Sequence, residues 1–156
     1  MIHALPPVAF ALLCLAPLSA QAQMPALCPL TGDQANCVRV LACIGNGDSW
    51  FHGRALGRGQ GTLHGQISDG TRCHGHWTQR NALGLGQAGL HCDDGRRATV
   101  LFTYQDEWTG TTTGIGSFDD GRPVTAWSGH NVLNYLDRVT GRPNRLPCPS
   151  GQVPIS

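Results

Sequence analysis

DGTRCHGHW at residues 69–77 recurs in outline as DGRRATVLF at 94–102 and as DGRPVTAW at 120–127. The Asp-Gly pairs are 25 and 26 residues apart, and a Gly-x-Gly precedes each of them. Asp-Gly favours the centre of a two-residue type I′ turn, because both central positions need a positive φ. The repeat therefore predicts three consecutive β-hairpins, joined as an antiparallel meander.

Residue content supports strands on either side of these turns. Segments 98–104 and 123–127 are rich in β-branched and aromatic residues, which fit a pleated surface. The Gly-x-Gly pairs that precede the turns are expected to mark bulges or places where neighbouring strands pack closely. The fold class predicted is all-β, in one domain with a modest core.

Pairing through the Asp69-Gly70 turn predicts the register of the first hairpin. A two-residue loop there sets Gln66 opposite Cys73. The chain then returns through residues 78–83 into a strand at 84–92. Cys73 and Cys92 consequently lie near the same end of neighbouring strands, so we expect a disulfide between them.

The first residues predict export. An apolar run from Val8 to Leu18 precedes Ala20-Gln21-Ala22, which fits the small-x-small pattern of a cleaved signal peptide. The run is too short to span a bilayer, and no later segment is a transmembrane candidate. We expect cleavage near Ala22 and a periplasmic or secreted mature chain. A lipid anchor at Cys14 is the disfavoured alternative.

Six cysteines follow the predicted cleavage point, and an even number in an exported chain predicts disulfides. Apart from Cys73 and Cys92, three lie near the start of the domain and one near its end, and their pairing is open. They are Cys28, Cys37, Cys43 and Cys148. A bond from the last of these to one of the other three would tie down the C-terminal segment.

The sequence divides into five segments. Residues 1–22 are the signal peptide, 23–48 a cysteine-containing N-terminal segment, and 49–127 the repeated hairpin core. Residues 128–141 are predicted to form one short helix, and 142–156, with their prolines, an extended tail. The helix is indicated by apolar residues at helical spacing, with Ser128 or Asn131 as its cap and Gly141 as its stop.

Composition excludes several functions. The formal net charge is only +1 at pH 7, which argues against a nucleic-acid partner. All eleven basic residues are arginines, so Schiff-base chemistry on lysine is excluded. No cofactor is expected, and Gly84-x-Gly86 is no nucleotide fingerprint because no helix follows it.

One part of the repeat resembles a known family. Cys73-x-Gly75-x-Trp77, followed by Gly84-x-Gly86 and by Asp94-Gly95, resembles the MORN repeat. The departures are a cysteine in place of the usual aromatic residue and a drifting spacing. The resemblance implies stacked β-hairpins that offer a surface to proteins or lipid, and it implies no catalytic residues.

Three groups of side chains are candidates for a site. Four aromatic residues are candidates for binding a sugar or peptide, although aromatics on such strands more often fill a core: Trp77, Trp108, Trp127 and Tyr104. His74 and His76 face one side of a strand and are the candidates for a metal site, although their spacing matches no familiar zinc pattern. The acidic pairs at 93–94, 106–107 and 119–120 suit turns better than acid–base catalysis.

These observations favour an exported, non-enzymatic β module with a binding or structural role in the periplasm or at the cell surface. Its partner would be an envelope component, whether protein, glycan or lipid. Two alternatives stay open: a small secreted hydrolase that acts on cell-wall or extracellular polymer, and a histidine-based metal-binding protein.

Overall fold

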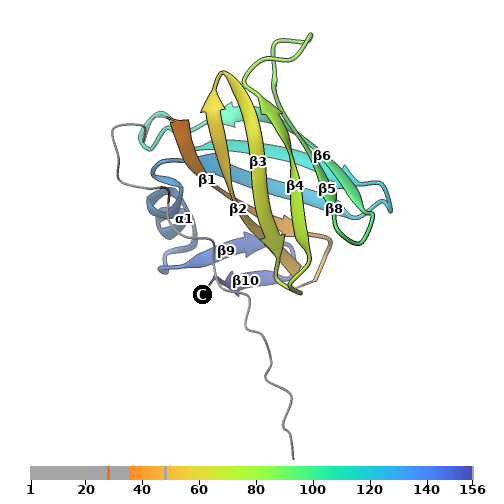
Figure 1. Ribbon diagram of the computed structural model, residues 1–156. Helices are drawn as coiled ribbons and strands as arrows, with labels where there is room; N and C mark the ends of the chain where they lie inside the picture. Colours follow the sequence, from red (N-terminus) through yellow and green to blue (C-terminus); the bar gives the residue numbers. More distant parts are fainter. Residues whose placement is uncertain (1–27, 29–35, 48, 156) are drawn as a thin grey trace, which may run out of the picture.

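The computed structural model describes Cys28, residues 36–47 and residues 49–155. Within these residues, strands β1 to β8 form a closed antiparallel barrel, and a two-stranded sheet and one helix follow it (Figure 1). The elements are β1 (Cys37–Ile44), β2 (Ser49–Arg58), β3 (Gln60–Ile67), β4 (Arg72–Thr78), β5 (Gly86–Cys92), β6 (Arg97–Gln105), β7 (Thr112–Phe118), β8 (Pro123–Gly129), α1 (Val132–Thr140), β9 (Arg145–Cys148) and β10 (Gly151–Pro154). The all-β class and the short helix near the C-terminus agree with the prediction from sequence.

Closure joins β1 to β8, so the meander has no open edge. The sequence predicts a separate N-terminal segment over residues 23–48, but β1 lies within it and belongs to the barrel. The barrel therefore extends from Cys37 to Gly129, beyond the predicted core of 49–127. β1 was missed because CVRVLACI does not alternate: its buried positions run together from Val40 to Ile44. Such a run arises when both faces of a strand are covered.

Inside the barrel, alternate residues of each strand pack into one apolar core. The buried members are Val40, Ala42, Ile44, Phe51, Ala55, Leu63, Ile67, Cys73, Ala88, Cys92, Ala98, Val100, Phe118, Val124 and Ala126. Many of them are small, because an eight-stranded barrel encloses just enough room for side chains.

Inward-facing glycines bring neighbouring strands into unusually close approach. A Cβ at Gly61 would lie 1.7 Å from the carbonyl oxygen of Leu56, and one at Gly75 would lie 1.8 Å from that of Gly89. A Cβ at Gly116 would lie 1.9 Å from the carbonyl oxygen of Thr99. Glycine is needed at these positions because any side chain would push the strands apart. Close strand packing, one of the two roles expected for the Gly-x-Gly pairs, is the one observed at Gly61 and Gly116.

The Asp-Gly turns differ from the two-residue type I′ turns that the sequence predicted. In each hairpin only the glycine has a positive φ, for example +93° at Gly70, while the aspartate does not. The amide of Gly70 donates to the Ile67 carbonyl, and the carboxylate of Asp69 accepts from the amide of Thr71. This is a three-residue loop with a glycine in the bulge position.

The extra loop residue shifts the register by one. Cys73 pairs with Gly65, and Gln66 pairs with Arg72 rather than with Cys73. The shift matters because it places Cys73 and Gly65 together on the inner face.

A second apolar cluster covers part of the outer surface, on strands β1, β2 and β8. Helix α1 and the β9–β10 hairpin pack there (Figure 1), with Leu136 and Leu146 fully buried against Leu41 and Trp127. The hairpin corrects the prediction of an extended tail over 142–156. Its prolines mislead because Pro147 and Pro154 lie inside a two-stranded sheet, where edge positions tolerate proline.

Three disulfides join the six described cysteines: Cys28–Cys37, Cys43–Cys148 and Cys73–Cys92. The last is the pair favoured from the sequence, and it lies within the barrel core between directly paired residues of β4 and β5. Cys148 joins Cys43, which fixes the hairpin to the outer face of β1. Three disulfides indicate an oxidising compartment. The predicted signal peptide lies outside the described residues.

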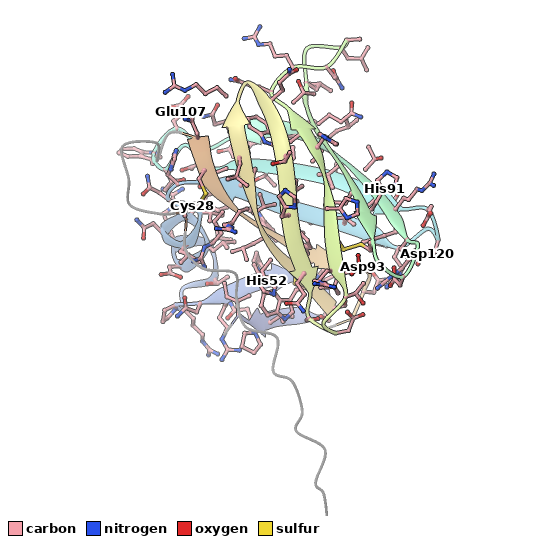
Figure 2. The ribbon with its side chains drawn as sticks, viewed as in Figure 1. Cys28, His52, His91, Asp93, Glu107 and Asp120 are labelled. Carbon is pink, nitrogen blue, oxygen red and sulfur yellow. A yellow bond between two sulfur atoms is a disulfide. The ribbon has the colours of Figure 1, made fainter. Side chains whose placement is uncertain are left out.

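The two ends of the barrel differ. The three Asp-Gly turns lie together at one end, where Figure 2 labels Asp93 and Asp120. The opposite end carries the longer β4–β5 loop (79–85) and β6–β7 loop (106–111), and Figure 2 labels Glu107 there. We call this second end the mouth.

Substituting Gly75 tests the close strand approach. Gly75→Ala forces a methyl group against the Gly89 carbonyl and is expected to destabilise the protein by about 1–3 kcal/mol or more. Gly89→Ala is the matched control on the facing strand, because a Cβ there has nothing within 4 Å, and its effect should stay within about 0.5 kcal/mol. Urea unfolding measures both. Equal effects would contradict this explanation of the glycines.

The disulfides should differ in their contribution to stability. Cys43–Cys148 spans 105 residues and Cys28–Cys37 spans 9. The chain-entropy model then predicts a loss of about 4–5 kcal/mol for Cys43→Ser/Cys148→Ser and of about 3 kcal/mol for Cys28→Ser/Cys37→Ser. Urea unfolding of the two double variants, each compared with the parent protein, measures this order. A larger loss from the short loop would contradict it.

Candidate functional site: the mouth of the barrel

An open pocket of about 1000 Å³ occupies the mouth. Residues from the ends of β1 to β8 line it, together with the loops that join β2 to β3, β4 to β5 and β6 to β7. Mouths of β-barrels are common places for small-molecule sites, and this volume is at the upper end of the usual range.

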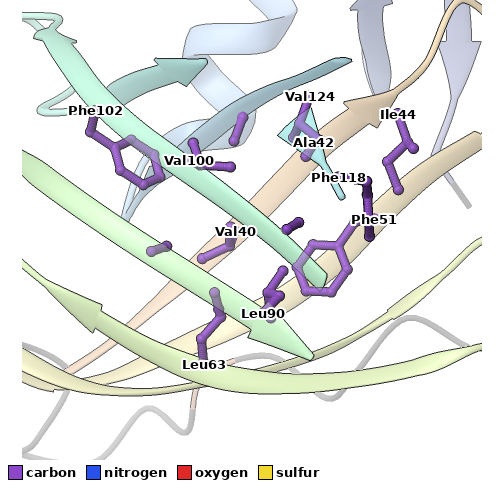
Figure 3. Close-up of a pocket in the computed structure, with 13 residues that line it drawn as sticks. Val40, Ala42, Ile44, Phe51, Leu63, Leu90, Val100, Phe102, Phe118 and Val124 are labelled. Atoms are coloured by element: carbon purple, nitrogen blue, oxygen red, sulfur yellow. The ribbon is translucent and has the colours of Figure 1, made fainter. Parts of the chain in front are cut away.

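The floor of the pocket is apolar. Val40, Leu63, Ala88 and Phe102 belong both to the mouth and to a small cavity of about 30 Å³ below it (Figure 3). The residues around this lower cavity are all apolar, so little favours water inside it. The lower half of the barrel is thus filled with side chains, and the upper half is open.

Trp77 forms a fixed part of the wall. It points inward from β4, opposite Gly61 and Ala88 on the neighbouring strands. Its indole Nε1 donates to the carbonyl oxygen of Leu56 at 3.0 Å. Because that bond satisfies the only polar group of the ring, the rest of the indole is left as an apolar surface.

Polar groups increase from the floor towards the rim. Thr78, Gln87, Thr112 and Ser128 line the walls, and the charged groups of the lining are the guanidinium groups of Arg58 and Arg80. No carboxylate is among the residues that line the pocket. Arg58 donates from Nε to the neutral side chain of Asn36 at 2.7 Å, and Arg80 is exposed. The lining therefore combines an apolar base with a cationic rim.

The aromatic residues proposed from sequence do not form one face. Trp77 lines the pocket wall, and Tyr104 lines the rim with its side chain more than half exposed. Trp127 is buried in the outer cluster beneath α1. Trp108 lies at the tip of the β6–β7 loop with 87% exposure. Sequence reasoning missed Phe102, Arg58 and Arg80 as pocket residues, since only barrel closure brings them together.

Most members of the acidic pairs have structural roles, which weakens the hydrolase alternative. Asp94 and Asp120 each cap their own turn and pair with the arginine two residues on, Arg96 or Arg122. The side-chain hydrogen bonds from these arginines, with further help from backbone amides, hold the pKa of both carboxyls below its usual range. A general acid needs the opposite shift.

Asp106 organises the β6–β7 loop. It is 5% exposed and accepts hydrogen bonds from the amide and the hydroxyl of Thr109 at 2.9 and 2.8 Å. Its other oxygen accepts from Arg138 of α1 at 2.6 Å. Burial alone would raise the pKa of Asp106, but the hydrogen bonds from Thr109 and the charge of Arg138 lower it overall.

The predicted metal candidates lie elsewhere, on the outer face of β3 to β5. His74 pairs across the sheet with His64 and with His91, and His76 follows on the same face of β4. All four are exposed. Among the described residues, no three histidine, cysteine or acidic side chains come together closely enough to hold a metal ion.

Comparisons with known proteins identify no family. No family model and no curated protein sequence matches the chain. No helix in the described part of the chain is long and apolar enough to cross a membrane. The resemblance to MORN repeats therefore stays a prediction.

Solved structures of designed barrels have a similar fold. A redesigned β-barrel, mFAP0, bound to DFHBI, shares 16% identity at a TM-score of 0.46 over 60% of this chain and 95% of that one. A second redesigned barrel, mFAP1, shares 20% identity at 0.46 over 60% of this chain and 92% of that one. A de novo designed fluorescence-activating β-barrel shares 16% identity at 0.48 over 61% of this chain and 91% of that one. A likeness at this level says nothing of what this chain binds.

Removing the Asp106 carboxylate should loosen the β6–β7 loop and change the acid sensitivity of the protein. A lowered pKa in the folded state means that the stabilisation is complete above the ordinary value of about 3.9 and is lost as the pH falls from there through the folded value. Asp106→Asn should lower stability at pH 7 and flatten its decline as the pH falls below the ordinary pKa of an aspartate, about 3.9.

Glu107→Gln provides the control, because Glu107 is exposed and forms no ion pair within the described residues. It should leave the pH profile unchanged. Thermal unfolding as a function of pH measures both variants. A profile for Asp106→Asn that stays parallel to the parent would show that the carboxylate does not contribute in this way.

Proposed function

We propose that this protein is an exported, non-enzymatic binding module that holds a small amphipathic molecule in the mouth of its barrel. The observation that carries this proposal is the pocket itself: an open space with an apolar floor, a fixed indole wall and a cationic rim. The molecule would have an aromatic or hydrocarbon body and an anionic or strongly polar head.

The apolar body of the proposed ligand would bind at the floor of the pocket, where its surface is removed from water. Phe102 and the inner face of Trp77, both partly exposed, offer hydrocarbon surface to the pocket above the buried Leu63. Removing such surface from water contributes about 25 cal/mol per Å². Core side chains such as Phe51 and Phe118 fill the lower half of the barrel, so the body must be short enough to fit in the upper half.

The polar head of the proposed ligand would lie at the rim, where the positive charges are. Arg58 and Arg80 lie at the rim and have no carboxylate partner within the described residues. An anionic head would be attracted by both guanidinium groups. Because the head stays partly in water, this attraction contributes only modestly to affinity. Affinity would come mainly from the body of the molecule, and orientation from its head.

Binding is favoured over catalysis by the chemistry of the lining. The only titratable side chains in it besides the arginines are His130 and Tyr104, and none of the lining residues is an acid or a cysteine. Ser128 and His130 both line the pocket, but no hydrogen bond joins their side chains among the described residues and no carboxylate orients the imidazole, so the lining holds no paired base and nucleophile of the kind that hydrolysis needs.

Two naphthalene probes test the proposal. N-phenyl-1-naphthylamine is uncharged, and 8-anilino-1-naphthalenesulfonate carries the same rings with a sulfonate. Both should bind one site with dissociation constants on the order of 10–100 µM, measured by fluorescence titration. Arg80→Gln should weaken binding of the sulfonate by about two- to fivefold and leave the neutral probe unchanged.

A blocked pocket supplies the decisive variant. Val38→Trp places a large ring in the open pocket and should weaken both probes by about tenfold or more. Ile115→Trp is the matched control, because Ile115 is 63% exposed on the outer face of β7. Equal binding by the two variants, or no binding by the parent protein, would overturn the assignment.

A further inference from the structure

Two of the most exposed apolar side chains in the described part of the chain lie at the mouth. Trp108 is 87% exposed in the β6–β7 loop, and Leu83 is 79% exposed in the β4–β5 loop. The β4–β5 loop projects beyond the ends of the strands (Figure 1). Neither residue lines the pocket, so neither gains from burial within this chain.

The loop that carries Trp108 is held in shape by hydrogen bonds. The Asp106 carboxylate accepts from Thr109 and Arg138, as described above. In addition, the backbone amide of Asp106 donates to the carbonyl oxygen of Thr111 at 2.8 Å. The backbone amide of Gly110 donates to the carbonyl oxygen of Asp106, also at 2.8 Å. The indole therefore stands on a defined turn.

The loop that carries Leu83 is built in the same way around Asn81. Its Oδ1 accepts from the amides of Leu83 and Leu85 at 2.8 and 3.1 Å, and its Nδ2 donates to Gln87 at 3.0 Å. The amide of Asn81 also donates to the Leu85 carbonyl at 2.7 Å. Two separate loops thus each use one polar side chain to hold a large apolar residue in solvent.

The occupant that fits both features is a lipid surface. Tryptophan and leucine on two loops at the same end of the barrel can enter the interfacial region of a bilayer, where the indole is especially favourable. Arg58 and Arg80 lie at the same end of the barrel, where their positive charges would attract anionic headgroups. The negative charge of the exposed Glu107 at this end would reduce that attraction. At the opposite end, four of the five aspartates of the Asp-Gly turns are paired with arginines.

We propose that the mouth docks on an anionic lipid surface through Trp108 and Leu83, so that the amphipathic ligand passes between the bilayer and the pocket. This proposal rests on the proposed function, since it names the source of the ligand. Docking in this orientation places the open pocket directly at the headgroups, where the polar head of a lipid-like molecule already lies.

The test is binding of the full chain to vesicles of about three parts phosphatidylcholine to one part phosphatidylglycerol, measured by co-sedimentation. The parent protein should bind, with a blue shift in tryptophan emission and weaker binding to pure phosphatidylcholine. Trp108→Ser and Leu83→Ser should each reduce partitioning by about tenfold, the factor for one large apolar side chain that stays in water. Most of the blue shift should be lost in Trp108→Ser, because Trp50 and Trp127 are buried and the indole of Trp77 is partly buried and held by the Leu56 carbonyl.

Ile115→Ser is the matched control, because it removes an exposed apolar residue far from the mouth and should leave vesicle binding unchanged. No vesicle binding by the parent protein, or an equal loss in Ile115→Ser, overturns the proposal. A Trp108-dependent dimer without vesicle binding would also overturn it and assign the surface to a second copy of the chain.

Probe binding separates this proposal from the proposed function. Trp108→Ser and Leu83→Ser should bind N-phenyl-1-naphthylamine as the parent does, because neither residue lines the pocket. If the probe binds and vesicles do not, docking fails alone. If vesicles bind through Trp108 and the probe does not bind, the pocket assignment fails and the docking surface stands.

Discussion

The barrel depends on direct backbone contact between strands at its inward-facing glycines. At Gly61, Gly75 and Gly116 the neighbouring carbonyl oxygen lies where a side chain would begin. A closed barrel of eight short strands must curve sharply, and curvature is cheapest where no Cβ separates the strands. Closure in turn leaves no free edge in the barrel and leaves the core so narrow that alanines and valines, together with Phe51 and Phe118, fill its lower half.

An antiparallel meander of eight strands sorts its connections between two ends. The Asp-Gly turns join β3 to β4, β5 to β6 and β7 to β8, so they fall together at one end by topology alone. The connections from β4 to β5 and from β6 to β7 fall at the other. Short turns with internal ion pairs close the first end, and longer loops keep the second open. The pocket thus opens at the end that carries the two longest connections of the barrel, although Gly59 alone joins β2 to β3 there.

The sequence predicts the hairpins and the Cys73–Cys92 contact well, because both rest on local signals. The register is wrong by one residue, since Asp-Gly also fits a three-residue loop in which only glycine takes a positive φ. β1 is missed because burial on both faces removes its alternation. The pocket could not be predicted at all: Val38, Trp77 and Phe102 are distant in the chain and meet only when the barrel closes.

The loops at the mouth explain how a pocket with an apolar floor stays open. A flexible loop carrying tryptophan or leucine would fold onto that floor, because burying such a side chain releases free energy. Asn81 and Asp106 prevent this by fixing the loop backbone through several hydrogen bonds each, and Arg138 ties one of the loops to α1. The bonds that hold Leu83 and Trp108 in solvent therefore also preserve the space for a ligand, so the exposed tips and the open pocket are two consequences of the same loop geometry.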